Sequence, residues 1–266
     1  MTPRLLVPGA LSGAREGATL VLAPDAAHHL RRVLRRQPGD AVVLFDGEGL
    51  SADGRIQHDA APAASRSRVP QTAILVQRVH AREPLPSLAI ELAQGISAAD
   101  KMDWTIEKAV ELGASAIVPL QCARSVVRLD ARRADNRMLH WQRLAAAACA
   151  QCGRNRLPML APPATFDEWI ARDAPPHEAS ASQATLRIHL DPRGGRSVPA
   201  ALSMLAEAPS RIILACGPEG GFDPEEARLL QAHGWAGLRL GPRVLRTETA
   251  AMTAIAMIQG WLGDLR

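Results

Sequence analysis

Two short stretches of the sequence combine glycine and proline with charged and hydroxyl side chains. The first, C-G-P-E-G-G-F, spans residues 216–222, and the second, L-G-P-R-V-L-R-T-E-T-A, spans residues 240–250. Glycine allows close backbone approach and positive φ, and proline fixes φ, so the amide and carbonyl groups of such loops can line a small molecule. The second stretch adds Arg246, Thr247 and Glu248, which are able to act on a substrate. Together the stretches predict a cofactor pocket with a reaction centre beside it, whereas either one alone also fits an ordinary turn from strand to helix.

Both stretches follow a short apolar run and lead into a helical pattern. The apolar runs predict buried strands over residues 88–93, 116–120, 186–190, 211–215 and 238–240. The predicted helices are one that starts with a Ser97–Asp100 capping box and ends at Gly113, then 137–151, 223–234 and 247–262. Continuous apolar strands that alternate with helices predict an α/β fold with a mainly parallel sheet covered on both faces. Such folds place their ligand loops at the carboxyl ends of the strands.

The first 80 residues have a different character, with short β-rich runs broken by Pro, Gly and Asp. The predicted strands are Arg4–Val7, Thr19–Leu22, Ala41–Phe45, Gly54–Gln57 and Ala73–Val79, with a loop over residues 61–68. One helix interrupts them, with Asp25 as its N-cap and an apolar side of Leu30, Val33 and Leu34. Its other side carries Arg31, Arg32, Arg35 and Arg36.

A small β-barrel with one basic helix suits docking to RNA, although a merely solvated helix face has the same pattern. Residues 1–80 hold 10 arginines against 7 acidic residues, so most of the chain's net charge of +4 lies there. His80–Ser87 contains two prolines and no periodicity, which predicts a linker. We therefore expect one domain over residues 1–80 and a second over 81–266.

The composition is that of an ordinary globular protein, with 47% hydrophobic and 22% charged residues. A sequence pI of about 9.3 admits a polyanionic partner without demanding one. The four cysteines are too few for a disulfide framework in 266 residues. No apolar run approaches the length of a membrane span, and no secretory signal is recognisable, so we expect a soluble cytoplasmic protein without a membrane partner.

Other motifs that carry chemistry are absent from the sequence. It contains no P-loop, no G-x-G-x-x-G after a strand, no G-x-S-x-G and no H-E-x-x-H. Cys149 and Cys152 have the spacing of metal ligands, but no second pair completes a site. A helix-packing role is favoured for this pair over a metal or redox role. His189, inside an apolar run, is expected in the core or at a pocket edge. We therefore expect no metal.

The two glycine-containing stretches resemble the bacterial 16S ribosomal RNA uracil-N3 methyltransferases, a family of the SPOUT superfamily of knotted methyltransferases. Segments in the same order extend the resemblance over most of the chain: 28–35 (H-H-L-R-R-V-L-R), 44–47 (L-F-D-G), 101–113 (K-M-D-W-T-I-E-K-A-V-E-L-G) and 148–156 (A-C-A-Q-C-G-R-N-R). The resemblance implies a PUA-like N-terminal barrel and a C-terminal SPOUT-type parallel sheet with a trefoil knot. It also implies a homodimer that binds S-adenosylmethionine and methylates uridine N3 in the decoding region of the small subunit, with an RNA site spanning both subunits.

On this interpretation the knot holds the cofactor with the loops and the neighbouring strand ends: Leu190, Leu214, Gly217, Pro218, Glu219, Gly220, Leu240, Gly241, Val244, Leu245, Thr247 and Thr249. Arg246 or another arginine stabilises the developing uracil anion, and Glu248 is a candidate base alongside Glu219 and the ionisation of the imide itself. The expected RNA contacts are Arg31, Arg32, Arg35, Arg36, Arg124, Arg128, Arg154 and Arg156. The RNA is expected either free or within the assembled small subunit.

Two other functions also fit the sequence. One is an RNA-binding dimer without catalytic activity, since a retained fold need not retain its reaction. The other is a different enzyme that uses the glycine loops for a nucleotide or phosphate, which the lack of lysine near those loops disfavours.

Overall fold

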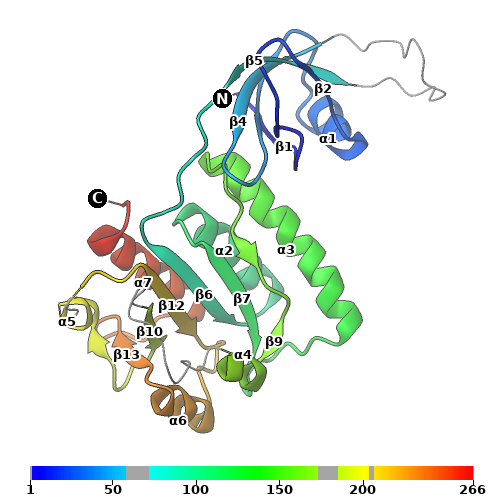
Figure 1. The fold of residues 1–266 in the computed structure, drawn as a ribbon. Coiled ribbons are helices and arrows are strands. Elements are labelled where there is room, and N and C mark those ends of the chain that lie inside the picture. The colour runs from blue at the N-terminus through cyan, green and yellow to red at the C-terminus, as the bar shows by residue number, and fades with distance from the viewer. Residues whose placement is uncertain (1, 58–71, 173–184, 204–206, 266) are drawn as a thin grey trace. The chain divides into compact units, whose positions relative to one another are not determined.

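The computed structural model describes residues 2–57, 72–172, 185–203 and 207–265 (Figure 1). The predicted loop at 61–68 lies outside the described residues. The chain divides into two compact units, one formed by residues 1–85 with 146–157 and the other by residues 86–145 with 158–266. One long helix, α3 (Ala131–Cys152), therefore begins in the second unit and ends in the first.

The first unit is built on a five-stranded sheet with the order β1-β3-β4-β5-β2. Its strands are β1 (Arg4–Leu6), β2 (Thr19–Val21), β3 (Ala41–Phe45), β4 (Ser51–Ile56) and β5 (Ala73–Val79). β1 pairs with β3 in parallel, and the other pairs are antiparallel. All five strands predicted from the sequence are present, although β4 begins at Ser51, three residues before its predicted start at Gly54. Alternate residues of these strands, among them Leu5, Val42, Leu44 and Ile74, form the buried core of the unit.

The helix in this unit differs from its prediction. α1 (Pro24–His28) starts at Pro24 with Ala23 as its N-cap, so the expected cap at Asp25 is wrong. Proline at the first helical position has no N–H to leave unsatisfied, which favours this start. The helix continues as a π-helix, η1 (His29–Val33), in which the Leu34 N–H bonds to the His29 carbonyl at 2.9 Å. The wider turn leaves Leu30 fully buried but Val33 59% exposed, so Val33 does not belong to the core.

The second unit contains a parallel sheet of eight strands, with the order β11-β13-β10-β12-β6-β7-β8 and β9 paired to β7. The strands are β6 (Ala89–Gly95), β7 (Ala116–Gln121), β8 (Met159–Leu160), β9 (Ala164–Thr165), β10 (Thr185–Leu190), β11 (Arg196–Ser197), β12 (Arg211–Cys216) and β13 (Ala236–Arg239). Every pair in this sheet is parallel, as the apolar runs predicted.

Helices cover this sheet. α4 (Phe166–Arg172) and α6 (Pro224–Ala232) bury Trp169 and Leu230 against Ala93, Val118 and Ile213 on one face. α7 (Thr247–Leu262) contacts β6 and β12 and packs against α2 (Ala99–Glu111). A short helix, α5 (Val198–Leu202), follows β11 and contacts β13 and α7. The predicted helix at 247–262 has the observed bounds, whereas α3 begins at Ala131, six residues before its predicted start at 137.

The capping box predicted for α2 is wrong. The N-cap of α2 is Ala98, and no side chain of its own first turn caps it. The hydroxyl of Ser97 is buried without a hydrogen-bond partner among the described residues. By contrast, Asp223 at the start of α6 makes a complete capping box with Glu226. The sequence at both helix starts has the residue types of a capping box. Only at α6 does the backbone place the cap side chain beside the free N–H groups.

Candidate functional site

The centre of the second sheet brings the two glycine-containing stretches together. β6 is the first strand of this unit, β7 lies on one side of it, and β12 lies on the other. The carboxyl ends of β6 and β12 are level, because Gln94 pairs with Cys216 in the parallel register. Chain order reverses direction at β6, and such a switch point leaves a crevice beyond the carboxyl ends of the strands. The stretch 216–222 starts in this position.

The loop after β12 packs so closely against β6 that side chains are excluded. A Cβ atom added to Gly95 would lie 2.5 Å from Pro218 Cδ and 2.7 Å from the Gly217 carbonyl carbon. One added to Gly217 would lie 2.7 Å from the Phe222 amide nitrogen. Gly221 adopts a φ of +68°, which glycine alone tolerates readily. The ring of Phe222 packs on that of Phe166, with centroids 5.8 Å apart, so the loop is anchored at both ends.

Thr247 fastens the two stretches to each other. Its hydroxyl donates to the Gly217 carbonyl at 2.5 Å and accepts from Gln94 Nε2 at 2.9 Å. The Cys216 thiol lies 3.3 Å from the same oxygen. Thr247 is 8% exposed and is the first residue of α7. The glycine loop, β6 and the start of α7 therefore form one hydrogen-bonded assembly, although they are far apart in the sequence.

Glu219 connects the glycine loop to α2. Its carboxylate accepts from the Ala98 N–H at 3.1 Å and from Lys101 Nζ at 3.2 Å. This carboxylate thus does the capping that was expected of Ser97 and Asp100. Burial raises the pKa of Glu219, but the hydrogen bonds from Ala98 and Lys101 outweigh it and hold the pKa below its ordinary value. A carboxylate held in its ionised form by two donors is a weak proton acceptor, which disfavours Glu219 as the base.

The loop after β7 is attached to the same glycine loop. Arg124 Nη1 donates to the Gly220 carbonyl at 3.1 Å, and Arg124 Nε lies 3.6 Å from Asp223 Oδ2. The buried carboxylate of Glu226 accepts from the Ala123 N–H at 2.7 Å and from the Asp223 N–H at 2.8 Å. We call these contacts the Arg124–Glu226 clamp. It sets the path of residues 219–223, so Arg124 has a structural partner at the site where an RNA contact was expected.

The two residues expected to carry the reaction lie at the start of α7. Arg246 is the N-cap residue; it is exposed, and its guanidinium has no hydrogen bond or ion pair to any described residue. Glu248 Oε2 is buried and likewise lacks a partner in the described chain. Both groups thus retain their full capacity to interact with a bound molecule.

Further buried polar atoms around these strand ends lack partners within the described residues: Gln94 Oε1, Ser97 Oγ and His189 Nε2. Burial lowers the pKa of His189, so this side chain is neutral near pH 7. Buried polar atoms in native proteins are nearly all hydrogen-bonded, so unused ones gathered at strand ends fit a polar ligand. The sequence did not indicate Gln94, and it indicated Ser97 only as a helix cap, although a glutamine within an apolar strand was a usable signal.

The remaining predicted cofactor contacts fall in two places. Residues 240–245 form an irregular segment in which Gly241 has a φ of +87° and Val244 is 81% exposed. Leu190 is half-buried at the end of β10. Leu214, in contrast, is fully buried within β12, two residues before the strand ends. Its contact with a cofactor stays a prediction, as do those of the other residues.

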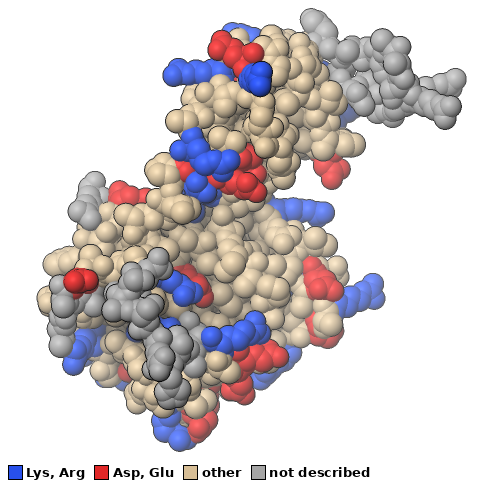
Figure 2. Space-filling model, viewed as in Figure 1, with Lys and Arg blue, Asp and Glu red and all other residues tan. Residues whose placement is uncertain are grey.

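The arginines expected to contact RNA are distributed over both units. Arg31, Arg32, Arg35, Arg36, Arg154 and Arg156 belong to the first unit, and Arg124 and Arg128 to the second. Arg156 is already engaged, because its Nη2 donates to the Glu83 carbonyl at 2.6 Å. Figure 2 shows basic and acidic side chains interspersed on the visible face. Arg124, Arg128 and Arg156 therefore have local partners, and an RNA contact by any of these arginines stays a prediction.

The thiol of Cys149 is buried, and this burial raises its pKa to about 12, so it is protonated at neutral pH. Among the residues that the structure describes, no group of three His, Cys, Asp or Glu side chains could hold a metal ion. Within the same residues, no helix is both long and apolar enough to cross a membrane.

Comparison with known proteins bears on this site directly. A family model described as an RNA methyltransferase domain matches residues 83–259, and one described as an RNA methyltransferase PUA domain matches residues 22–60. The ribosomal RNA small subunit methyltransferase E of Synechocystis sp. is 32% identical and covers 92% of this chain and 74% of its own length. The Bacillus subtilis protein of the same name is 29% identical, with coverages of 91% and 90%.

Solved structures agree with these matches. A methyltransferase from Legionella pneumophila, determined with bound S-adenosylmethionine, has a TM-score of 0.84 and 34% identity over the whole of both chains. A ribosomal RNA small subunit methyltransferase E from Neisseria gonorrhoeae, bound to the same cofactor, has a TM-score of 0.82 and 29% identity, also over both whole chains.

The parallel sheet with ligand loops at its switch point, the PUA-type unit and these matches define the class: the protein is an RNA methyltransferase. Within that class, the chain belongs to the ribosomal RNA small subunit methyltransferase E family.

Proposed function

We propose that the protein methylates N3 of a uridine in the decoding region of 16S ribosomal RNA, with S-adenosylmethionine as methyl donor. The observation that carries the proposal is the assembly at the carboxyl ends of β6 and β12. There two glycine-containing stretches are fastened together by Thr247, and unpartnered polar atoms surround them. Relatives of this chain that share the fold bind S-adenosylmethionine.

The residues at the strand ends suit this cofactor. The backbone of residues 217–220 and 240–245 would hold the adenosine, and the free acceptor of Gln94 would receive one of its hydroxyl, amino or ammonium donors. S-adenosylmethionine, when bound, supplies a methyl group activated by its attachment to a positively charged sulfur. One lysine does lie at the glycine loop, because Lys101 Nζ is 3.2 Å from Glu219 Oε1, so the expectation that no lysine lies near these loops is wrong. Its charge is already paired with this carboxylate, which still disfavours a triphosphate site.

Arg246 and Glu248 would act on the uridine. The imide proton at N3 must leave as the new N–C bond forms, and the negative charge spreads to the neighbouring carbonyl oxygens. The unpaired guanidinium of Arg246 would donate to such an oxygen and stabilise this charge. Glu248 is the candidate acceptor of the proton, since its Oε2 has no other partner in the described residues. N3 takes part in base pairing, so the target base must be unpaired or flipped out.

We further propose that residues 1–80 form the RNA-docking domain and residues 81–266 the catalytic domain. The matches at 22–60 and 83–259 support this division. The trefoil knot, the homodimer and a cytoplasmic location belong to the same proposal. Family membership supports the knot, in which the segments joined by Thr247 would take part. Apolar side chains exposed on and after α7, Met257, Trp261 and Leu265, support the homodimer.

A transfer assay with labelled S-adenosylmethionine tests the proposal. The acceptors are small-subunit RNA from a strain that lacks this modification, offered free and within assembled subunits. We expect label at N3 of one uridine, located by nuclease digestion and mass spectrometry. Absence of cofactor binding at millimolar concentration would overturn the proposal. Cofactor and RNA binding without transfer would instead identify a catalytically silent RNA-binding protein.

A further inference from the structure

A cavity of about 520 Å³ lies in the second unit, outside the set of residues expected to bind the cofactor. Its walls are formed by the loop after β7 and the first turns of α3. The residues that line it are Val127, Arg128, Leu129, Arg133, Asn136, Arg137 and His140. Its size falls within the range of roughly 300–1,000 Å³ that small-molecule sites occupy.

The loop wall of this cavity is held rigid by hydrogen bonds. Gln121 Nε2 donates to the Val127 carbonyl at 3.1 Å, and Gln121 Oε1 accepts from the Leu129 N–H at 3.2 Å. Arg128 Nη2 donates to the Ala123 carbonyl at 2.9 Å. The loop therefore needs no reordering before it can receive a ligand, which lowers the entropic cost of binding.

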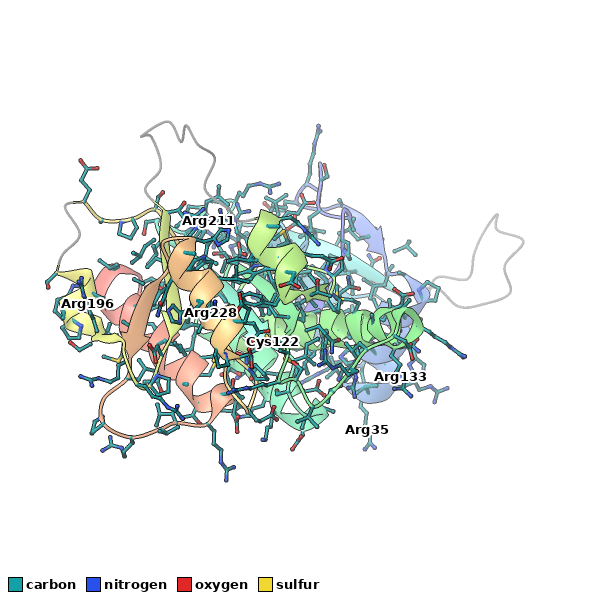
Figure 3. The ribbon with its side chains drawn as sticks, turned by 90° about the horizontal axis from the view of Figure 1, so that it is seen from below. Arg35, Cys122, Arg133, Arg196, Arg211 and Arg228 are labelled. Atoms are coloured by element: carbon teal, nitrogen blue, oxygen red, sulfur yellow. The ribbon has the colours of Figure 1, made fainter. Side chains whose placement is uncertain are left out.

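The helix wall presents one polar face. Arg133, Asn136, Arg137 and His140 occur at the spacing i, i+3, i+4 and i+7, so they share one side of α3. Figure 3 labels Arg133 on this part of the helix and Cys122 at the end of β7, where the loop begins.

Two acidic residues lie next to the cavity, and both are engaged. Asp130 pairs with Arg133, with Nε and Oδ2 3.4 Å apart, and Asp103 Oδ2 lies 2.7 Å from His140 Nε2. Arg137 is half-buried and has no hydrogen bond or ion pair within the described part of the chain. Three arginines, Arg128, Arg133 and Arg137, thus line the cavity, and two carboxylates lie beside it. Of these arginines, Arg137 has no partner within the described residues.

We infer that this cavity binds a phosphate of the substrate RNA backbone together with its ribose. The inference rests on the proposed function, because it assigns part of the RNA path. Arginine binds phosphate through paired N–H groups, and the Asn136 amide adds a further donor. The partly buried side chains of Val127 and Leu129 offer an apolar surface to the sugar. These donors line one cavity between a hydrogen-bonded loop and one side of α3, which distinguishes this site from scattered surface arginines.

Binding of a fragment of small-subunit RNA, measured over a series of salt concentrations, tests the inference. We compare wild type, Arg137→Ala and Arg133→Ala, with Arg228→Ala as the matched control. Arg228 lies on α6 of the same unit and has a side chain that is 71% exposed, like that of Arg133 at 72%. Loss of one phosphate contact should raise Kd about tenfold at low salt and lower the slope of log Kd against log salt by about 0.7–0.9. S-adenosylmethionine affinity and Arg228→Ala should match wild type.

The inference is overturned if neither cavity variant changes the salt slope, or if Arg228→Ala changes it equally, since the effect would then follow net charge alone. Circular dichroism and cofactor titration identify a misfolded variant. The exposed Arg133 then provides the test if Arg137→Ala does not fold. Failure of the proposed function gives a different result. In that case wild type still binds RNA with a salt-dependent Kd, but it transfers no methyl group. With active enzyme, the variants should raise KM for RNA and leave kcat unchanged.

Discussion

At the scale of single residues, side chains of the same type differ in whether they already have hydrogen-bond or ion-pair partners. Arg246 and Arg124 both lie near the glycine loops, yet Arg246 has no partner in the described chain while Arg124 holds the Gly220 carbonyl. Glu219 and Glu248 differ in the same way, because two donors satisfy Glu219 and Glu248 Oε2 has none. The groups without partners are those able to act on a substrate.

Arg246→Ala should therefore abolish methyl transfer and leave folding and assembly intact. Loss of a preorganised donor at a developing charge typically lowers a rate by about 100- to 1,000-fold. Arg246 is exposed and caps no helix with its side chain, so we expect a change in unfolding free energy within about 0.5 kcal/mol. Single-turnover transfer and sedimentation measure the two properties. A dissociated or unfolded variant would mean that Arg246 is a structural residue.

Glu219→Gln should change the dependence of stability on pH. The pKa of Glu219 is lower in the folded protein than its ordinary value of 4.5. The ionised carboxylate therefore stabilises the fold above that value, and this contribution disappears as pH falls through the folded pKa. Urea unfolding should show wild type more stable than Glu219→Gln at pH 7, with the difference shrinking below about pH 4.5. A difference that stays constant from pH 7 to pH 4 contradicts a role for the charge.

At the scale of elements, loops that are distant in the sequence position one another. Thr247 joins the start of α7 to the end of β12, Glu219 joins the glycine loop to α2, and the Arg124–Glu226 clamp joins it to the loop after β7. In each connection, one of the two partners is a residue of the glycine loop or of the segment that follows it. The conformation of residues 217–223 thus depends on α2, on the start of α7 and on the loop after β7.

Arg124→Ala should weaken cofactor binding more than RNA binding. The variant frees the Gly220 carbonyl and removes the ion pair to Asp223, so the loop gains conformational freedom that a ligand must then take away. We expect the Kd for S-adenosylmethionine to rise about threefold to tenfold by calorimetry, with Arg228→Ala on α6 as the control. If RNA affinity falls and cofactor affinity does not, Arg124 is the RNA contact that its position in the sequence suggested.

At the scale of the whole molecule, α7 has one side that is buried and another that exposes apolar side chains. Ala251, Ile255 and Ile258 are buried in the second unit, while Met257 and Trp261 are 41% and 55% exposed. Large apolar side chains left exposed on a helix mark a surface that another molecule covers. A second copy of this chain is the partner that family membership favours.

Trp261→Glu should convert the proposed homodimer to a monomer, because a buried interface does not tolerate an unpaired charge. Methyl transfer should fall with it, since the RNA site is expected to span both subunits. Analytical ultracentrifugation over a range of concentrations measures the assembly. A variant at another exposed apolar residue, Met159→Glu, is the control, as Met159 is 60% exposed and lies off α7. A dimer that persists in Trp261→Glu places the interface elsewhere.

The sequence alone determined much of this protein. The apolar runs located strands in both units, and the helix at 247–262 has the predicted bounds. Asp223-Pro224 also started a helix as its residues indicated. These features were predictable because periodicity, capping and turn chemistry act over a few neighbouring residues. The glycine-rich stretches were found for the same reason, since the conformational range of glycine is a property of the residue itself.

Only the tertiary structure decided which side chains near the glycine loops lack a hydrogen-bond partner within the described residues. Gly95 carries no local mark, yet its lack of a side chain lets the loop at Pro218 approach β6. Glu219 and the Ala98 N–H, which it caps, are 121 residues apart, and Arg124 and Gly220 are 96 apart. The placement of residues 146–157 with the N-terminal strands is of the same kind. Spacing in the sequence says nothing about such pairs, because the sheet register brings them together. The glycine stretches were therefore recognisable in the sequence, but the groups left available for chemistry beside them were not.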